Sequence, residues 1–139
     1  MERADPSGPL RAPEPKGTVL IVDDDPVLCE FVSMALAEQG YQTVTAGDGM
    51  RALELVTERV PAAVILDVGM PLLGGTDLAE RIRELCGVAV PCIVMSGSPP
   101  PADDMQDSAV CGYLAKPFDI DELFRLVERH ARVEPAPVP

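Results

Sequence analysis

The sequence predicts a single α/β domain built on a doubly wound, five-stranded parallel sheet with helices on both faces. Short apolar segments alternate along the chain with segments of amphipathic, helical periodicity. Parallel strands need crossover connections, and helices of this kind supply them. The 139 residues, 47% of them hydrophobic, are enough to bury one sizeable core.

The expected strands are short runs of apolar or β-branched residues at 18–22, 41–46, 63–67, 92–96 and 112–115. Three of these runs are continuously apolar, as central strands that are buried on both faces should be: 18–22, 63–66 and 92–95. The segment YQTVTA at 41–46 instead alternates between apolar and polar residues. It is therefore expected at an edge of the sheet.

The expected helices follow the strands, at about 26–39, 49–59, 76–86 and from the region of Asp119 to about 133. Pro26 suits a first helical turn and Gly40 suits a helix end. Asp48 and Asp119 are expected as N-caps. A further segment at 102–109 predicts a fourth helix that is short or irregular, because three consecutive prolines precede it at 99–101.

Composition sets the domain limits and excludes several classes of function. Residues 1–17 and 134–139 are proline-rich and lack apolar periodicity, so we expect flexible tails around a domain at 18–133. No apolar stretch is long enough for a membrane span or a secretion signal, which predicts a cytoplasmic protein without membrane contact. The net charge of −12 comes without a basic stripe, so direct nucleic-acid binding is not expected.

The four cysteines form no CxxC pair, and their positions are 29, 86, 92 and 111. We expect them to be reduced residues in or near the core. A structural disulfide or a redox switch is the alternative.

Polar side chains follow four of the expected strands. Three acids, at 23–25, come after the first strand, Asp67 ends the third, Ser96 ends the fourth, and Lys116 follows the fifth. The carboxyl ends of parallel strands meet at one edge of a sheet, where such folds bind their ligands. These residues are therefore expected to form one site.

The chemistry of this set points to phosphoryl transfer. Converging carboxylates repel one another unless a cation neutralises them, and Mg²⁺ prefers hard oxygen ligands. A carboxylate such as Asp67 can accept a phosphoryl group as an acyl phosphate. A metal ion, the Lys116 ammonium and the Ser96 hydroxyl could stabilise the charge on the transferred oxygens. Asp25 is instead expected to be an acid at a helix start, where the dipole favours it.

Four motifs resemble those of the receiver domains of two-component response regulators, and the resemblance covers about residues 18–132. They are TVLIVDDDP at 18–26, LDVGMP at 66–71, VMSG at 94–97 and GYLAKPF at 112–118. The resemblance implies a flavodoxin-like sheet with strand order 2-1-3-4-5. It also implies Mg²⁺ as cofactor and Asp67 as the phosphoacceptor.

The remaining site residues are assigned by the same resemblance. Asp23 and Asp24 hold the metal ion, Asp24 being favoured as the direct ligand, with Asp67 and the backbone carbonyl of Gly69. Ser96 is the switch hydroxyl and Tyr113 is the aromatic switch residue. The alternative role for Tyr113 is purely structural, with its ring packed in the core. Lys116 binds phosphate, and the bond that follows it, to proline, is cis in the family.

The partners implied are a histidine kinase or histidine phosphotransfer protein and a downstream target protein. The resemblance implies a kinase-docking face on the first helix and a homodimerisation face on the fifth.

Catalysis is expected to extend only to the domain's own Mg²⁺-dependent phosphorylation and dephosphorylation. Two other classes stay open: an interaction module that works without phosphorylation, and a phosphatase or other metal enzyme of similar topology. Gly69 occupies a position where relatives often carry a larger polar residue that influences attack of water on the acyl phosphate. The rate at which the acyl phosphate hydrolyses is therefore not predicted.

Overall fold

The computed structural model describes residues 16–67, 75–87, 90–97 and 110–131. Its strands are β2 (Thr18–Val22), β3 (Gln42–Ala46), β4 (Ala63–Asp67), β5 (Cys92–Ser96) and β6 (Val110–Ala115). Its helices are α1 (Pro26–Glu38), α2 (Gly49–Glu58), α3 (Gly75–Cys86) and α5 (Ile120–His130). The expected helix at 102–109 lies outside the described residues.

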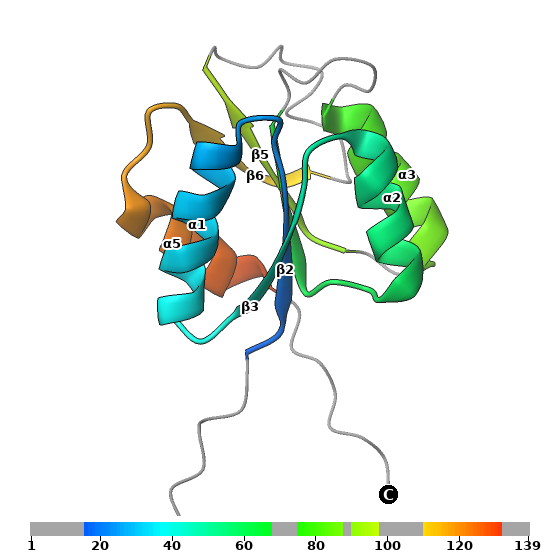
Figure 1. Cartoon of the computed structure of the whole chain (residues 1–139), viewed down its shortest axis with the longest axis horizontal. Coiled ribbons are helices and arrows are strands. Elements are labelled where there is room, and N and C mark those ends of the chain that lie inside the picture. The colour runs from blue at the N-terminus through cyan, green and yellow to red at the C-terminus, as the bar shows by residue number, and fades with distance from the viewer. Residues whose placement is uncertain (1–15, 68–74, 88–89, 98–109, 132–139) are drawn as a thin grey trace, which may run out of the picture.

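All five strands are parallel and form one sheet in the order β3-β2-β4-β5-β6. In chain order this is 2-1-3-4-5, so the predicted topology is confirmed. Helices α1 and α5 cover one face of the sheet and α2 and α3 cover the other, as seen along the sheet from the β3 edge (Figure 1). The prediction that the segment at 41–46 forms an edge strand is also confirmed.

Two hydrophobic cores lie on the two faces, because successive side chains of a strand point to opposite sides. Leu20 and Val22 of β2 pack with buried residues of α2 and α3, including Val56 and Ile82. The intervening residues of β2 pack on the other face with α1 and α5. β2 is buried along its whole length. Each fully buried aliphatic side chain contributes about 1.5 to 3 kcal/mol.

Side-chain caps fix where three helices begin. Asp25, Asp48 and Asp119 are the N-caps of α1, α2 and α5 and accept hydrogen bonds from backbone N–H groups of the first turn. α1 ends as predicted before Gly40, whose φ of 99° is a left-handed conformation that glycine adopts without strain. The caps thus set the lengths of these helices.

Several boundaries differ from the sequence prediction by one to three residues. The second strand begins at Gln42, because the N–H of Tyr41 still bonds to the Leu36 carbonyl at the end of α1. β6 begins at Val110, two residues before the predicted 112. α5 ends at His130, because Ala131 has left the helical conformation at ψ 135°.

The expectation that every cysteine lies in or near the core is wrong for Cys111. None of the four cysteines forms a disulfide, and Cys29 and Cys92 are buried, but Cys111 is exposed. The pairing of β5 with β6 shifts at this point, with Cys92 opposite Val110 and Ile93 opposite Gly112. Cys111 is therefore the extra residue of a bulge.

The chain enters the domain through Lys16 and Gly17, whose backbone groups bond to Gly40 and Gln42. Residues 1–15 and 132–139, to which most of the two expected tails belong, lie outside the described residues. Within the described part of the chain, every helix is too short or too polar to span a membrane.

Candidate functional site

Three carboxylates meet where β2 and β4 end. Val22 is paired with Leu66, so Asp23 follows at the level of Asp67 in the neighbouring strand. Oxygen atoms of Asp23, Asp24 and Asp67 all lie within 4.8 Å of one another. Asp23 is 1% exposed, whereas Asp24 is exposed. The cluster therefore has a buried base and a side open to solvent.

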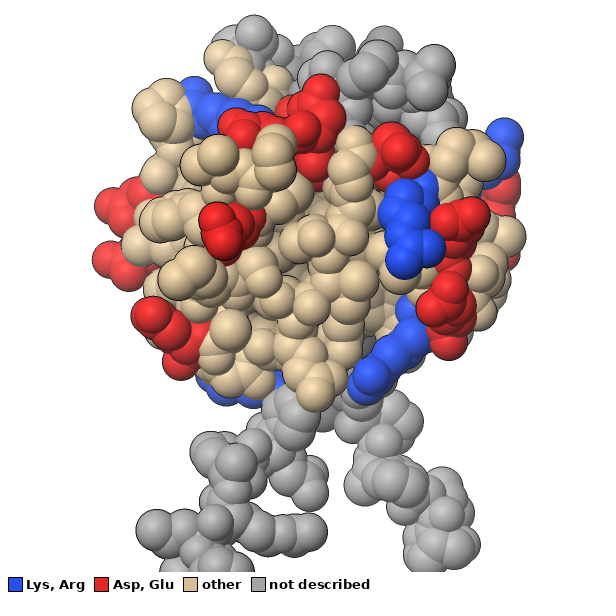
Figure 2. Space-filling view, in the orientation of Figure 1, with Lys and Arg blue, Asp and Glu red and all other residues tan. Residues whose placement is uncertain are grey.

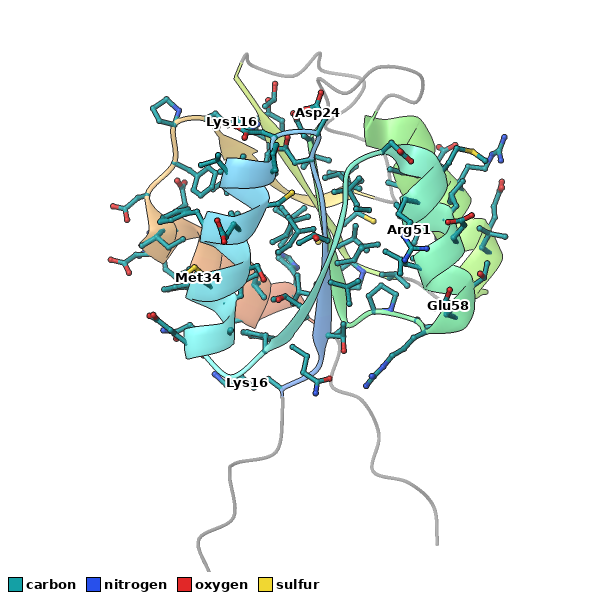
Figure 3. All side chains as sticks on the ribbon, viewed as in Figure 1. Lys16, Asp24, Met34, Arg51, Glu58 and Lys116 are labelled. Atoms are coloured by element: carbon teal, nitrogen blue, oxygen red, sulfur yellow. The ribbon has the colours of Figure 1, made fainter. Side chains whose placement is uncertain are left out.

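Lys116 places its ammonium between two of these acids. Its Nζ lies 3.2 Å from Asp23 Oδ2 and 3.5 Å from Asp67 Oδ2. The Lys116 backbone N–H donates to the Ser96 carbonyl over 2.7 Å, which ties the end of β6 to the end of β5. The bond between Lys116 and Pro117 is cis, as the resemblance implies. Lys116 and Asp24 project at the same end of the sheet (Figure 3).

Burial and charge shift the pKa values of Asp23 and Lys116. Burial raises the pKa of Asp23 above 3.8, although hydrogen bonds from the Asp25 N–H and Lys116 partly offset this effect. Burial alone would lower the pKa of Lys116, but the hydrogen bond to Asp23 and the charges of Asp23 and Asp67 outweigh it and raise that pKa. The lysine is therefore held as a cation, and its charge favours ionised acids.

Asp25 has a separate role from its two acidic neighbours. Its Oδ1 accepts hydrogen bonds from the N–H groups of Val27 and Leu28, at 3.0 and 3.4 Å, and so caps α1. Its own N–H donates to Asp23 Oδ1 over 2.9 Å, which orients that carboxylate. The interpretation of Asp25 as a helix-start acid outside the metal site agrees with this geometry.

Ser96 lies at the carboxyl end of β5, and Tyr113 lies within the neighbouring strand β6. Asp67 is paired with Met95, so Ser96 follows one residue beyond it, and the Ser96 side chain is buried. Tyr113 is paired with Val94 in the middle of β6 and is half-buried. Gly69, the remaining residue assigned to the metal site, lies outside the described residues.

One contact of the site had no signal in the sequence. The thiol of Cys29, on the first turn of α1, donates to the backbone carbonyl of Asp23 over 3.3 Å. Burial, and then the negative charge of Asp23, raise the pKa of this thiol, so it stays protonated as a donor. A cysteine four residues after an acidic run has no recognisable spacing, and only the fold brings the two groups together.

The donor set fits a divalent cation of the magnesium class. Its three carboxylates are hard oxygen donors on rigid strand ends, and the open side leaves room for water and a phosphoryl oxygen. Among the described residues, the cluster has no soft ligand, because Cys29 points its sulfur at a carbonyl group and not at the cluster. A carboxylate beside a cation and a lysine is suited to accept a phosphoryl group.

Comparisons with known proteins agree with this geometry. The family model described as "Response regulator receiver domain" matches residues 19–128. The probable transcriptional regulatory protein TcrX of Mycobacterium tuberculosis is 37% identical over 108 residues, which are 76% of this chain and 46% of TcrX. The DNA-binding response regulator MtrA of Mycolicibacterium smegmatis is 34% identical over 116 residues, 82% of this chain and 50% of MtrA. The chain thus spans about half the length of these curated relatives.

Solved structures show the same fold. The chemotaxis protein CheY4 of Vibrio cholerae superposes with a TM-score of 0.74 at 28% identity, covering 81% of this chain and 97% of CheY4. The receiver domain of a sensor histidine kinase from Pseudomonas aeruginosa, solved with a magnesium ion in its active-site cleft, superposes with a TM-score of 0.73 at 29% identity. That match covers 82% of this chain and 96% of the other.

Proposed function

The chain belongs to the family of response regulator receiver domains, and from this premise we propose that it is a phosphorylation switch whose acceptor is Asp67. The phosphodonor is a phosphohistidine on a histidine kinase or a histidine phosphotransfer protein. An Asp67 carboxylate oxygen forms the new bond to phosphorus as the bond from phosphorus to the imidazole nitrogen breaks. That nitrogen then takes up a proton, and Asp67 holds an acyl phosphate.

The observation that carries this proposal is the position of Lys116 against both buried acids. Its Nζ is 3.5 Å from the Asp67 carboxylate, where an ammonium can bind an oxygen of a phosphoryl group attached to Asp67. Asp23 holds the lysine from the other side at 3.2 Å. The acceptor and its counter-charge are therefore in place before the phosphoryl group arrives.

The metal site would be formed by Asp23, Asp24 and Asp67, with the Gly69 carbonyl as a further ligand. When bound, Mg²⁺ neutralises the acids and polarises the phosphoryl oxygens. Asp24 is the exposed member of the cluster and faces the side from which a hydrated ion enters. Asp23 is the buried member and is oriented by the Asp25 N–H. A similar receiver domain was solved with a magnesium ion in its active-site cleft, which supports a magnesium site in this fold.

The conformational response is proposed to run through Ser96 and Tyr113. The Ser96 carbonyl already accepts a hydrogen bond from the N–H of Lys116. A phosphoryl group on Asp67 would draw the Ser96 hydroxyl toward it and change the packing beside Tyr113. The two arrangements would present different surfaces to a downstream target.

A phosphodonor kinase and a downstream target are the partners that membership of this family implies. The alternative of an interaction module without phosphorylation is not favoured, because acceptor, acids and lysine are all brought together. DNA binding and transcriptional control are properties named for relatives of which the match covers only about half. The cytoplasmic location and the absence of direct nucleic-acid binding stay predictions.

The acceptor is tested by incubating the protein with Mg²⁺ and acetyl phosphate and measuring its intact mass. We expect a gain of one phosphoryl group that is stable in acid and lost in base. Asp67→Asn should abolish the gain, while Asp25→Asn should keep it. A gain that survives Asp67→Asn would refute the assignment of the acceptor.

The switch is tested separately by NMR, with beryllofluoride as the phosphoryl mimic. The amides of Ser96, Tyr113 and Lys116 should shift more than those of α1 and α2. Shifts confined to the acid cluster would leave phosphoryl acceptance standing but would contradict the proposed response.

A further inference from the structure

The edge strand β3 has an open backbone edge. The N–H of Gln42 donates to Gly17 and the carbonyl of Ala46 accepts from Asp23, both on the side of β2. In a parallel ladder the two backbone groups of one residue point to the same neighbour, and the direction alternates along the strand. Thr43 and Thr45 therefore direct their N–H and C=O groups away from β2, to the side where the sheet ends.

This edge lacks the features that commonly block pairing with another strand. The sequence of β3, QTVTA, contains no charged residue and no proline. Gln42, Val44 and Thr45 are exposed, with 36% of Val44 accessible. Protected edges usually carry lysine, proline or an inward-pointing charge. The view onto β3 shows a largely uncharged centre with most charged side chains at its margins (Figure 2).

Grooves run along both sides of β3. The groove toward α1 touches the C-terminal end of β3 at Thr45, passes Ser33 and Met34, and reaches Asp23 and Asp24 of the acid cluster. The groove toward α2 is mainly apolar, and Val44, Leu55 and Pro61 contribute to its lining. An added strand would direct alternate side chains into these two grooves.

We propose that β3 is a homodimerisation edge, at which β3 of a second copy of this chain pairs antiparallel with its own counterpart. The segment Thr43-Val44-Thr45 reads the same in both directions. A two-fold axis at Val44 therefore sets Thr43 of each copy against Thr45 of the other. Each of these threonines offers both of its backbone groups outward, so each such pair exchanges both hydrogen bonds. The two sheets join into one.

The side chains of this arrangement are self-complementary. Val44 meets Val44 of the second copy across the axis in a pair without backbone bonds, where side chains lie closest. Thr43 and Thr45 of the two copies form cross-strand pairs, which favour sheet pairing. The interface is isologous and closes on itself, so it yields a dimer and no open polymer.

The helix α2 flanks the paired strands on one face of the sheet. Arg51 lies on the first turn and Glu58 is the last residue of α2, and both face the viewer of the β3 edge (Figure 3). The two-fold axis sets α2 antiparallel to α2 of the second copy. Within α2, Arg51 already pairs with Glu54, their side chains lying 3.2 Å apart, so this part of the helix brings little net charge to its copy. On the other face, Ser33 and Met34 of α1 lie beside β3, and the Ser33 hydroxyl hydrogen-bonds with that of Thr43.

The net charge of −12 opposes association of two identical chains. Screening by salt reduces this repulsion, whereas the backbone bonds and the Val44 contact are insensitive to salt. The dimer should therefore be concentration-dependent and should strengthen as ionic strength rises.

Sedimentation velocity of the full chain tests the proposal, at about 0.01 to 1 mM protein. It is carried out in EDTA without phosphodonor, so its outcome is independent of Asp67 phosphorylation. We expect a monomer-dimer equilibrium that shifts to dimer with added salt. Thr45→Pro removes an outward N–H that β2 does not use, and it should weaken association about 30-fold or more, since each dimer loses two donors. Thr45→Val keeps the donor and should remain dimeric.

Two further measurements keep the proposal testable if Thr45→Pro folds poorly. Val44→Lys sets like charges directly opposite each other and should leave the chain monomeric. In the wild-type protein, hydrogen exchange at the amides of Thr43 and Thr45 should slow as concentration rises, while that of other exposed amides stays constant. A chain that is monomeric throughout, or a dimer unaffected by Val44→Lys, would overturn the proposal.

Discussion

Replacing Asp24 by asparagine should stabilise the metal-free protein and remove most of its stabilisation by Mg²⁺. Oxygens of Asp23, Asp24 and Asp67 lie within 4.8 Å of one another. Two like charges at that separation repel by about 3.5 kcal/mol at an effective dielectric constant of ~20 and by about 0.9 kcal/mol in bulk water. Asp24 is exposed, so the lower figure applies, and the expected gain is about 1 kcal/mol.

The effect should reverse when Mg²⁺ is bound. A ligand at ~100 times its dissociation constant stabilises a folded protein by about 2.7 kcal/mol. Asp24→Asn removes one of the carboxylates proposed to bind the ion, so this stabilisation should largely disappear. The variant should therefore be more stable than the wild type in EDTA and less stable in saturating Mg²⁺.

Urea unfolding followed by far-UV circular dichroism, in EDTA and in Mg²⁺, measures both changes. Asp25→Asn is the matched control, because it removes a neighbouring charge that caps α1, and asparagine caps about as well as aspartate. The control should keep the Mg²⁺ response. The reasoning fails if Mg²⁺ stabilises Asp24→Asn as much as the wild type, or if Asp25→Asn loses the response equally.

Three further predictions follow from the same structure. Lys116→Met leaves Asp23, which is 1% exposed, without its cation. The variant should therefore lose about 1 to 3 kcal/mol of metal-free stability and take up a phosphoryl group about 10²-fold more slowly. An unchanged urea midpoint would contradict the role of the ion pair. The folded-state pKa of Asp23 is raised, chiefly by burial, so the stabilisation from its protonation is present below pH 3.8 and lost as pH rises through the raised value. In EDTA, the wild type should therefore lose unfolding free energy relative to Asp23→Asn as pH rises from 3.8 through the raised pKa. A stability difference that does not change with pH would contradict the raised pKa. Leu123→Ala, at a fully buried position of α5, should cost about 2 to 5 kcal/mol in the same assay, and a smaller loss would show that the site collapses around the truncation.

The sheet could be predicted from the sequence because its strands differ in how they are buried. The continuously apolar runs at 18–22, 63–66 and 92–95 became central strands, and QTVTA became the edge. Boundaries were less certain, since the start of β6 depends on a bulge at Cys111 that arises from its pairing with β5. Periodicity within one segment carries no information about a bulge that depends on another strand.

The candidate site could be predicted as a set of residues but not as a set of contacts. The rule that strands of a parallel sheet present their carboxyl ends at one edge was sufficient to group Asp23, Asp67 and Lys116. That Lys116 approaches Asp23 more closely than Asp67, by 3.2 against 3.5 Å, depends on side-chain geometry. The same holds for the hydrogen bond from Cys29 to the Asp23 carbonyl.

The acceptor assignment is tested most directly by locating the acyl phosphate in the chain. The protein is phosphorylated with acetyl phosphate and Mg²⁺ and then treated with borohydride, which reduces an aspartyl phosphate to homoserine. Peptide mass spectrometry should find homoserine at position 67 and unmodified aspartate at positions 23 and 24. Homoserine at either of those two positions, or at none of the three in a protein that has gained a phosphoryl group, would contradict the assignment of Asp67.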